Sequence, residues 1–121
     1  MRGLWLGLCL ACVATVALAS GNKWRLQFSG GAESAGHIIL ALTPDQGEPL
    51  QVTIDIAKGR SENAVAKDVR DGLRAQAGAH YSVEVDDGED VLVKKKRNEP
   101  NFAVTVVENT VQGVRINPDE E

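Results

Sequence analysis

Residues 59–78 read GRSENAVAKDVRDGLRAQAG, and this stretch predicts one amphipathic helix set between two runs of strands. Its apolar side chains Val65, Val69 and Leu73 recur at every fourth position, and this spacing places them on one face of a helix. The stripe is narrow and made of small residues, so such a helix would be marginally stable in isolation. We therefore expect it to lie close against a sheet.

Both ends of this helix carry sequence signals. Ser61 is a good N-cap, because its hydroxyl oxygen can accept a hydrogen bond from a backbone N–H that has no partner within the helix. Gly78 is expected to end the helix in the left-handed conformation, which glycine adopts without steric penalty.

The first residues predict an export signal. An uncharged apolar run covers residues 4–19 and ends in the small–x–small form of a signal-peptidase site. We therefore interpret residues 1–19 as the signal peptide of a bacterial protein that is periplasmic or secreted, with no stable membrane insertion after cleavage. A retained transmembrane helix is one alternative, and a lipid anchor on Cys12 is another.

The composition of the chain after residue 19 excludes several kinds of site. Both cysteines, Cys9 and Cys12, precede this point, so the mature chain has no disulfide framework and no thiolate nucleophile. Loss of Arg2 leaves 12 basic residues against 17 acidic ones, a net charge of −5. That balance argues against nucleic acid as a partner, because nucleic-acid binding needs a basic surface.

The chain around the helix predicts three strands before it and four after it. They are expected at residues 23–28, 37–43, 50–56, 81–86, 90–96, 102–106 and 111–117. Most of them alternate apolar and polar residues, which favours an α+β fold with a mainly antiparallel sheet of about six to seven strands and one helix packed on one face. A small sandwich with the helix as a lid is the alternative. Residues 20–117 are expected to form a single domain, and residues 118–121 a frayed acidic tail.

A charged hairpin is the candidate interaction site. Asp87 and Gly88 predict a tight turn, because both residues tolerate a positive φ. Carboxylates crowd this turn and lysines follow it, and we predict that these side chains form an interaction patch made of Asp86, Asp87, Glu89, Asp90, Lys94 and Lys96. The carboxylates lack the spacing of a calcium loop, so no metal is expected. A lysine-protected edge strand would explain the same lysines without any partner.

The chain contains no recognisable catalytic signature, and no catalytic residue is expected. Ser34 lies in a glycine-containing loop but precedes a predicted strand, whereas a nucleophile elbow precedes a helix. The two histidines, His37 and His80, have no partner motif in the sequence. We therefore predict neither a catalytic site nor a cofactor.

The segment LQVTIDIAKGRSENAVAKDVRDGLRAQAGAHYSVEVDDGEDVLVKKK, residues 50–96, resembles the small strand–helix–hairpin modules of phage tail-surface proteins. The resemblance depends on Gly59, Ser61, Gly88 and the apolar spacing, and it covers under half of the mature chain. It implies a similar local fold and brings no catalytic residues with it.

These features predict a small exported domain that works by binding another protein, through an exposed sheet surface or an unpaired edge strand. A structural subunit of a cell-envelope or secreted assembly is one alternative. A small hydrolase-like enzyme is the other, and it would need a pocket that joins a histidine, a carboxylate and Ser34.

Overall fold

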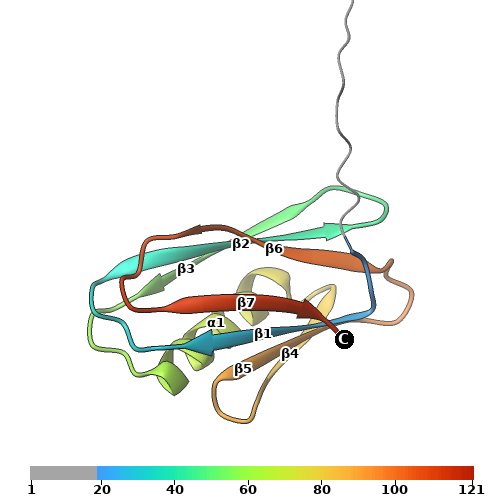
Figure 1. Ribbon diagram of the computed structural model, residues 1–121. Helices are drawn as coiled ribbons and strands as arrows, with labels where there is room; N and C mark the ends of the chain where they lie inside the picture. The colour runs from blue at the N-terminus through green and yellow to red at the C-terminus, as the bar shows by residue number, and fades with distance from the viewer. Residues whose placement is uncertain (1–18) are drawn as a thin grey trace, which may run out of the picture.

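The computed structural model describes residues 19–121 (Figure 1). Most of the predicted export signal, including Cys9 and Cys12, lies outside the described residues. The described chain forms, in order, β1 (Lys23–Ser29), β2 (Gly36–Pro44), β3 (Leu50–Ile56), α1 (Glu62–Ala77), β4 (Tyr81–Asp86), β5 (Asp90–Lys95), β6 (Phe102–Asn109) and β7 (Arg115–Glu120). Within this range, no helix has the length and apolar character needed to cross a membrane.

The strands form two antiparallel sheets, where we expected one. One sheet has the order β4-β5-β1-β7 and the other has the order β3-β2-β6. Along the described chain the sheet changes four times: between β1 and β2, between β3 and β4 through α1, between β5 and β6, and between β6 and β7. The molecule is thus a small α+β fold. The division into two sheets agrees with that part of the alternative, a sheet that splits into two. Alternation in the sequence identifies strands but not their neighbours, so it could not decide between one sheet and two.

The helix α1 begins at the predicted residue and ends differently. Ser61 is the N-cap, and its Oγ accepts a hydrogen bond from the N–H of Ala64 at 3.2 Å. Gly78 has φ −65° and ψ −15°, so the expected left-handed cap was wrong. Its N–H donates to the carbonyl oxygen of Arg74 at 3.2 Å, and the chain therefore leaves the helix through one more right-handed turn.

The apolar stripe of α1 enters the core shared by both sheets. The helix contacts β3 of one sheet and β4 of the other, and also β1 and β5 (Figure 1). Val65, Val69 and Leu73 are completely buried, as the spacing predicted. A Cβ atom on Gly72 would lie 2.6 Å from Cγ1 of Ile54, so the helix backbone approaches β3 more closely than a larger residue would allow.

One hydrophobic core joins the two sheets and the helix. Four aromatic residues lie in it: Trp24, Phe28, Tyr81 and Phe102. The rings of Tyr81 and Phe102 are tilted against each other with their centres 4.7 Å apart. The indole Nε1 of Trp24 donates a hydrogen bond to the carbonyl oxygen of Phe102 at 2.8 Å, so Phe102 connects β1, β4 and β6.

The last strand lies further along the chain than predicted. We expected that strand to begin at residue 111, but residues 111–114 lie in the turn between β6 and β7, where Gly113 has φ +88°. β7 then pairs with β1 from Arg115 to Glu120, so the frayed tail expected at residues 118–121 was wrong. Pro118 made a strand look unfavourable at this position. Proline is nevertheless accepted in an edge strand when its ring faces away from the neighbouring strand.

Candidate interaction site

The predicted hairpin is present between β4 and β5. Asp87 and Gly88 have φ values of +52° and +79°, as the turn chemistry predicted. The N–H of Glu89 donates to the carbonyl oxygen of Asp87 at 2.9 Å. Asp86 and Asp90 lie directly opposite each other at the base of the turn. Their proximity requires a cation nearby, because like charges across a strand pair destabilise it.

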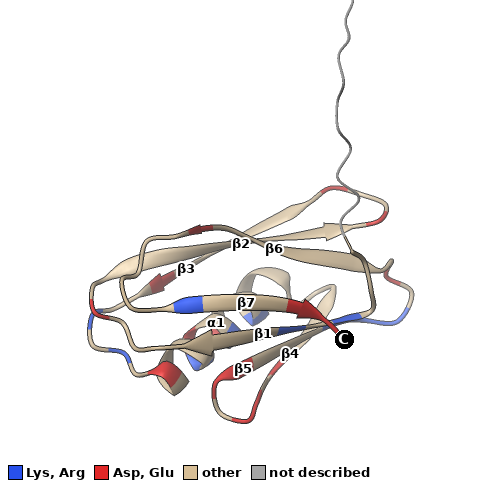
Figure 2. Cartoon of the chain, viewed as in Figure 1, with Lys and Arg blue, Asp and Glu red and all other residues tan. Residues whose placement is uncertain are grey.

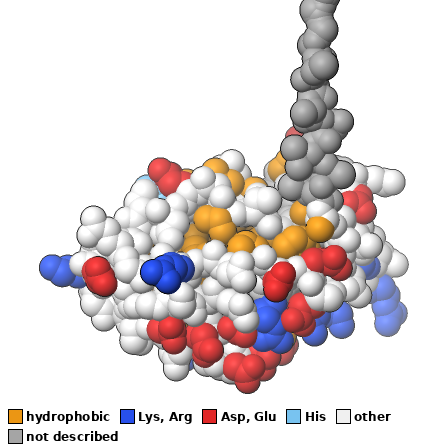
Figure 3. Space-filling view, in the orientation of Figure 1, with side chains coloured by type: hydrophobic (Ala, Val, Ile, Leu, Met, Phe, Trp, Pro, Cys, Tyr) orange, Lys and Arg blue, Asp and Glu red, His pale blue; other side chains and the backbone are white. Residues whose placement is uncertain are grey.

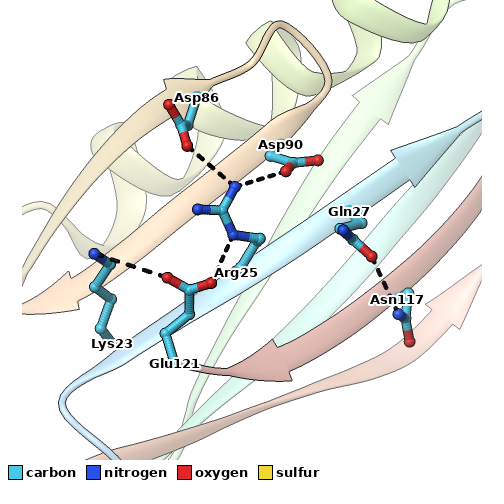
Figure 4. A network of polar contacts seen from close by, with 7 residues as sticks. All are labelled: Lys23, Arg25, Gln27, Asp86, Asp90, Asn117 and Glu121. Carbon is cyan, nitrogen blue, oxygen red and sulfur yellow. Dashed lines mark hydrogen bonds and ion pairs between the residues drawn. The ribbon is translucent and has the colours of Figure 1, made fainter.

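Arg25 on the neighbouring strand β1 supplies that cation (Figure 4). Its Nη1 lies 2.6 Å from Oδ2 of Asp90 and 3.1 Å from Oδ2 of Asp86, and its Nε lies 2.7 Å from Oε2 of Glu121. Lys23 adds a longer contact of 3.8 Å to Glu121. The network therefore fastens the hairpin and the C-terminal residue to β1. Asp90 is only 6 % exposed, so its charge serves this contact and not an accessible surface.

The network shifts the pKa values of two of its members, Arg25 and Glu121. The hydrogen bond from Arg25 holds the pKa of Glu121 below its ordinary value, and the positive charge of the guanidinium acts in the same direction. The hydrogen bonds to Glu121 and Asp90 raise the pKa of Arg25. Arg25 and Glu121 therefore both carry their charge at neutral pH, and the hydrogen bond between them is charge-assisted.

Replacement of Glu121 by glutamine should lower the thermal midpoint at pH 7 and have no effect in acid. The folded state lowers the pKa of Glu121, so its stabilising effect is present above the ordinary pKa of about 4.3 and is lost as the pH falls through the lower folded value. Thermal melts of the wild type and Glu121→Gln between pH 7 and pH 2.5 would measure this convergence. Glu84→Gln, which removes an exposed carboxylate of β4, is the control and should show no such convergence.

The lysines of the predicted patch lie in different surroundings. Lys94 is exposed and lies between Ser82 of β4 and Lys23 of β1, so β5 is an interior strand and not the edge strand considered for it. Lys96 donates from Nζ to the carbonyl oxygen of Gly78 at 2.6 Å, next to the C-terminal end of α1. A cation is favourable there because it satisfies a free carbonyl and the helix dipole. The role of the six residues in binding stays a prediction.

The outer faces of the two sheets differ in charge (Figure 2). The alternating outward residues of the four-stranded sheet are mostly charged, and include Lys23, Arg25, Glu84, Lys94 and Arg115. Those of the three-stranded sheet are mostly small or uncharged, and include Ile39, Ala41, Thr43, Thr53, Ala103 and Thr105. A partner that avoids the charged face would therefore meet the three-stranded sheet.

Side chains of α1 bond one backbone position on each of two of the four sheet edges. The amide of Gln76 bonds both backbone groups of Thr53 on β3: its Oε1 accepts from the N–H at 3.2 Å and its Nε2 donates to the carbonyl oxygen at 2.8 Å. Nε of Arg74 donates to the carbonyl oxygen of Val83 on β4 at 2.8 Å. These contacts satisfy backbone groups that an open edge would offer to another strand. No sequence pattern identified them, because each depends on where the helix lies.

The edge of β7 is protected by proline. The N–H of Glu121 donates to the carbonyl oxygen of Lys23 at 3.0 Å, so alternation directs the backbone groups of Ile116, Pro118 and Glu120 away from β1. Pro118 has no N–H to offer on that side. A strand added to β7 would therefore lose one hydrogen bond of the ladder.

The edge of β6 has neither kind of protection beyond its first residue. Phe102 exchanges two hydrogen bonds with Gly21, at 3.0 and 2.9 Å, on the side away from β2. Alternation directs the N–H and C=O groups of Val104 and Val106 to the same side. Among the described residues, none of these four groups pairs with another strand. We call the backbone of Val104 to Val106 on this side the β6 edge.

Hydrophobic side chains lie next to the β6 edge. Figure 3 shows them at the surface in a band between β6 and β7. Val106 and Ile116 are partly buried against the core, Pro118 is half-buried, and Val107 is 50 % exposed, the one large hydrophobic residue among those described that is largely exposed. An added strand could therefore cover apolar surface as well as satisfy backbone groups.

The side chains of His37, His80 and Ser34 each bond a different residue. Nε2 of His37 lies 3.0 Å from Oε1 of Glu108, and Nδ1 of His80 lies 2.8 Å from Oε2 of Glu99. Ser34 accepts a hydrogen bond from the N–H of Gln112 at 3.0 Å, which fixes a loop. The described residues contain no group of three or more carboxylate, histidine or cysteine side chains placed to hold a metal ion.

Tyr81 is the most perturbed ionisable group of the core. It lines an open depression with His80, Glu99 and the turn at residues 47–50. Burial raises the pKa of its hydroxyl, and the nearby charge of Glu99 raises it further. The effect has the direction expected for a phenol that loses its hydration when ionised.

The phenol of Tyr81 should titrate above its ordinary pKa of about 10 in the folded protein. The chain has one tyrosine, so alkaline absorbance at the phenolate band reports on this residue alone. The same titration in concentrated urea is the control and should return to the ordinary value. Equal midpoints in the folded and unfolded protein would contradict the burial of this hydroxyl.

Comparison with known proteins identified no relative: no protein-family model matches the chain, and no curated protein sequence matches it. The resemblance of residues 50–96 to phage tail-surface modules is not tested by these findings and stays a hypothesis. The proposals below therefore depend on the geometry of this chain.

Proposed function

We propose that this protein is an exported binding protein that takes up an extended segment of another protein on the β6 edge. The observation that carries the proposal is the contrast among the four sheet edges. Gln76 bonds the backbone of Thr53 at the centre of β3, Arg74 bonds the carbonyl oxygen of Val83 on β4, and Pro118 interrupts β7. Val104 and Val106, by contrast, offer four backbone groups beside apolar surface. An extended segment added to such an edge gains main-chain hydrogen bonds and packs alternate side chains.

The chain itself supports the idea that a strand fits beside β6. Gly21 pairs with Phe102 on the same side, at the start of the edge. A partner segment that continued this line would place every second side chain over Val106 and Ile116, which are partly buried. We therefore expect the partner segment to alternate apolar and polar residues.

The charged hairpin is a weaker candidate for the main contact. Arg25 holds Asp86 and Asp90, and Lys96 is bonded to the end of α1, so their charges already have partners. The remaining charged residues of the predicted patch are Asp87, Glu89 and Lys94. They would affect the association rate of a partner more than its affinity.

Selection from a random peptide library on the purified protein would test the proposal. We expect the selected peptides to alternate apolar and polar residues, and to lose binding to Val106→Lys, which places a charge at the β6 edge. Gln51→Lys introduces the same charge at an exposed position of β3, on the opposite edge of the same sheet, and should retain binding. Binding should also slow amide exchange at Val104 and Val106 and leave Val83 on the far edge unchanged. Selected peptides that bind both lysine variants equally would contradict the proposal.

A further inference from the structure

Ser20, Gly21 and Asn22, which follow the predicted cleavage site, form hydrogen bonds with the rest of the fold. Oγ of Ser20 donates a hydrogen bond to Oδ1 of Asp45 at 2.6 Å. Gly21 is buried and exchanges two hydrogen bonds with Phe102, and the carbonyl oxygen of Asn22 accepts from the N–H of Lys95 at 3.0 Å. Ala19 is exposed. Among the described residues, specific contacts therefore start at Ser20, the first residue that a signal peptidase would leave.

Two carboxylates flank this starting point. Asp45 lies in the turn between β2 and β3, where its N–H donates to the carbonyl oxygen of Asn101 at 2.9 Å and fixes its position. The carboxylate of Glu120, on β7, lies so close to Gly21 that a Cβ atom there would overlap it. Among the described residues, neither carboxylate has an ion-pair partner within 4.0 Å. One carboxylate lies beside Ser20 and the other beside Gly21.

We propose that Asp45 and Glu120 bind the α-ammonium group that cleavage of the Ala19–Ser20 bond creates. In that hydrolysis, water gives its hydroxyl to the carbonyl carbon of Ala19 and a proton to the nitrogen of Ser20, which takes up a further proton at neutral pH. The new group lies on the residue already bonded to Asp45 and next to the glycine that contacts Glu120. Hydrogen bonds between an ammonium and carboxylates are stronger than those between neutral groups.

This inference depends on the export and cleavage that the proposed function assumes, and it gives the cleavage a structural role. Bound at this point, the new amino terminus would hold Gly21 against Phe102 and so define where the β6 edge begins. The buried core residues of the described chain lie between Trp24 and Val114, so a chain that starts at Ser20 contains every one of them.

Thermal melts of two chains at pH 7 would test the proposal, one beginning at Ser20 and the other at Ala19. The second chain carries its ammonium one residue further out, about 3.8 Å along the chain. We expect the chain beginning at Ser20 to melt about 2–5 °C higher. Asp45→Asn and Glu120→Gln should each reduce this difference, whereas Glu48→Gln, a change in the same turn as Asp45, should leave it intact.

Acetylation of the Ser20 amine provides a second measurement, because it removes the charge and keeps the length. It should lower the midpoint of the chain beginning at Ser20 and have a smaller effect once Asp45 and Glu120 are both amides. Equal midpoints for the two chains, or an acetylation effect that is the same in every background, would overturn the inference. Peptide binding that Val106→Lys abolishes would still support the proposed function in that case, so the two failures are distinguishable.

Discussion

Replacement of Phe102 by alanine should lower the free energy of unfolding by about 3–5 kcal/mol. The ring is completely buried and packs against Tyr81 at 4.7 Å, so its removal leaves a cavity where β4 and β6 meet. The loss is a large part of the about 5–15 kcal/mol that stabilises a typical domain. Urea denaturation followed by tryptophan fluorescence would measure it, since Trp24 donates to the carbonyl oxygen of the same residue.

The substitution tests the side chain alone. The backbone groups of residue 102 that bond Trp24 and Gly21 remain in the variant. Val107→Ala, in the same strand but 50 % exposed, is the matched control and should change the free energy by about 0.5 kcal/mol or less. A loss below about 1 kcal/mol for Phe102→Ala would show that the two sheets do not share the core described here. The pKa of Tyr81 should also move toward its ordinary value, because water would reach the cavity edge.

The sequence identified nearly all of the elements because their signals are local. The apolar spacing at Val65, Val69 and Leu73, the N-cap at Ser61 and the turn at Asp87 each depend on a few neighbouring residues. The errors occurred where a distant partner decides the conformation. Residues 118–121 have an acidic, proline-containing sequence typical of a loose end, and only the pairing with β1 and the cation on Arg25 make them a strand.

The candidate site was less predictable for the same reason. The charged hairpin was predicted as the site because its carboxylates and lysines are close together in the sequence. Whether those charges are available depends on Arg25, which is sixty-one or more positions away in the chain. The β6 edge has an apolar, β-branched sequence that is equally typical of an interior strand. Its openness becomes visible only once Gln76, Arg74 and Pro118 are seen to protect the other edges.

Replacement of Leu73 by alanine should lower the free energy of unfolding by about 2–5 kcal/mol. The side chain is completely buried in the stripe by which α1 contacts β3 and β4. Alanine keeps the helix propensity, so the loss reports on packing and not on helix formation. Lys67→Ala, an exposed position of the same helix, is the control and should change stability by about 0.5 kcal/mol or less. Urea denaturation would measure both variants.

The same variant should also open a protected edge. Gln76 lies one turn beyond residue 73 and covers Thr53 only while the helix stays seated, so Leu73→Ala should speed amide exchange at Thr53 through local opening. It should leave the exchange of Val106 unchanged, because the main contacts of α1 are with β3, β4, β1 and β5 and not with β6. Unchanged exchange at Thr53 in a clearly destabilised variant would mean that Gln76 covers β3 independently of helix packing. The contrast among the four edges would then need another origin, and the argument that singles out β6 would lose its main support.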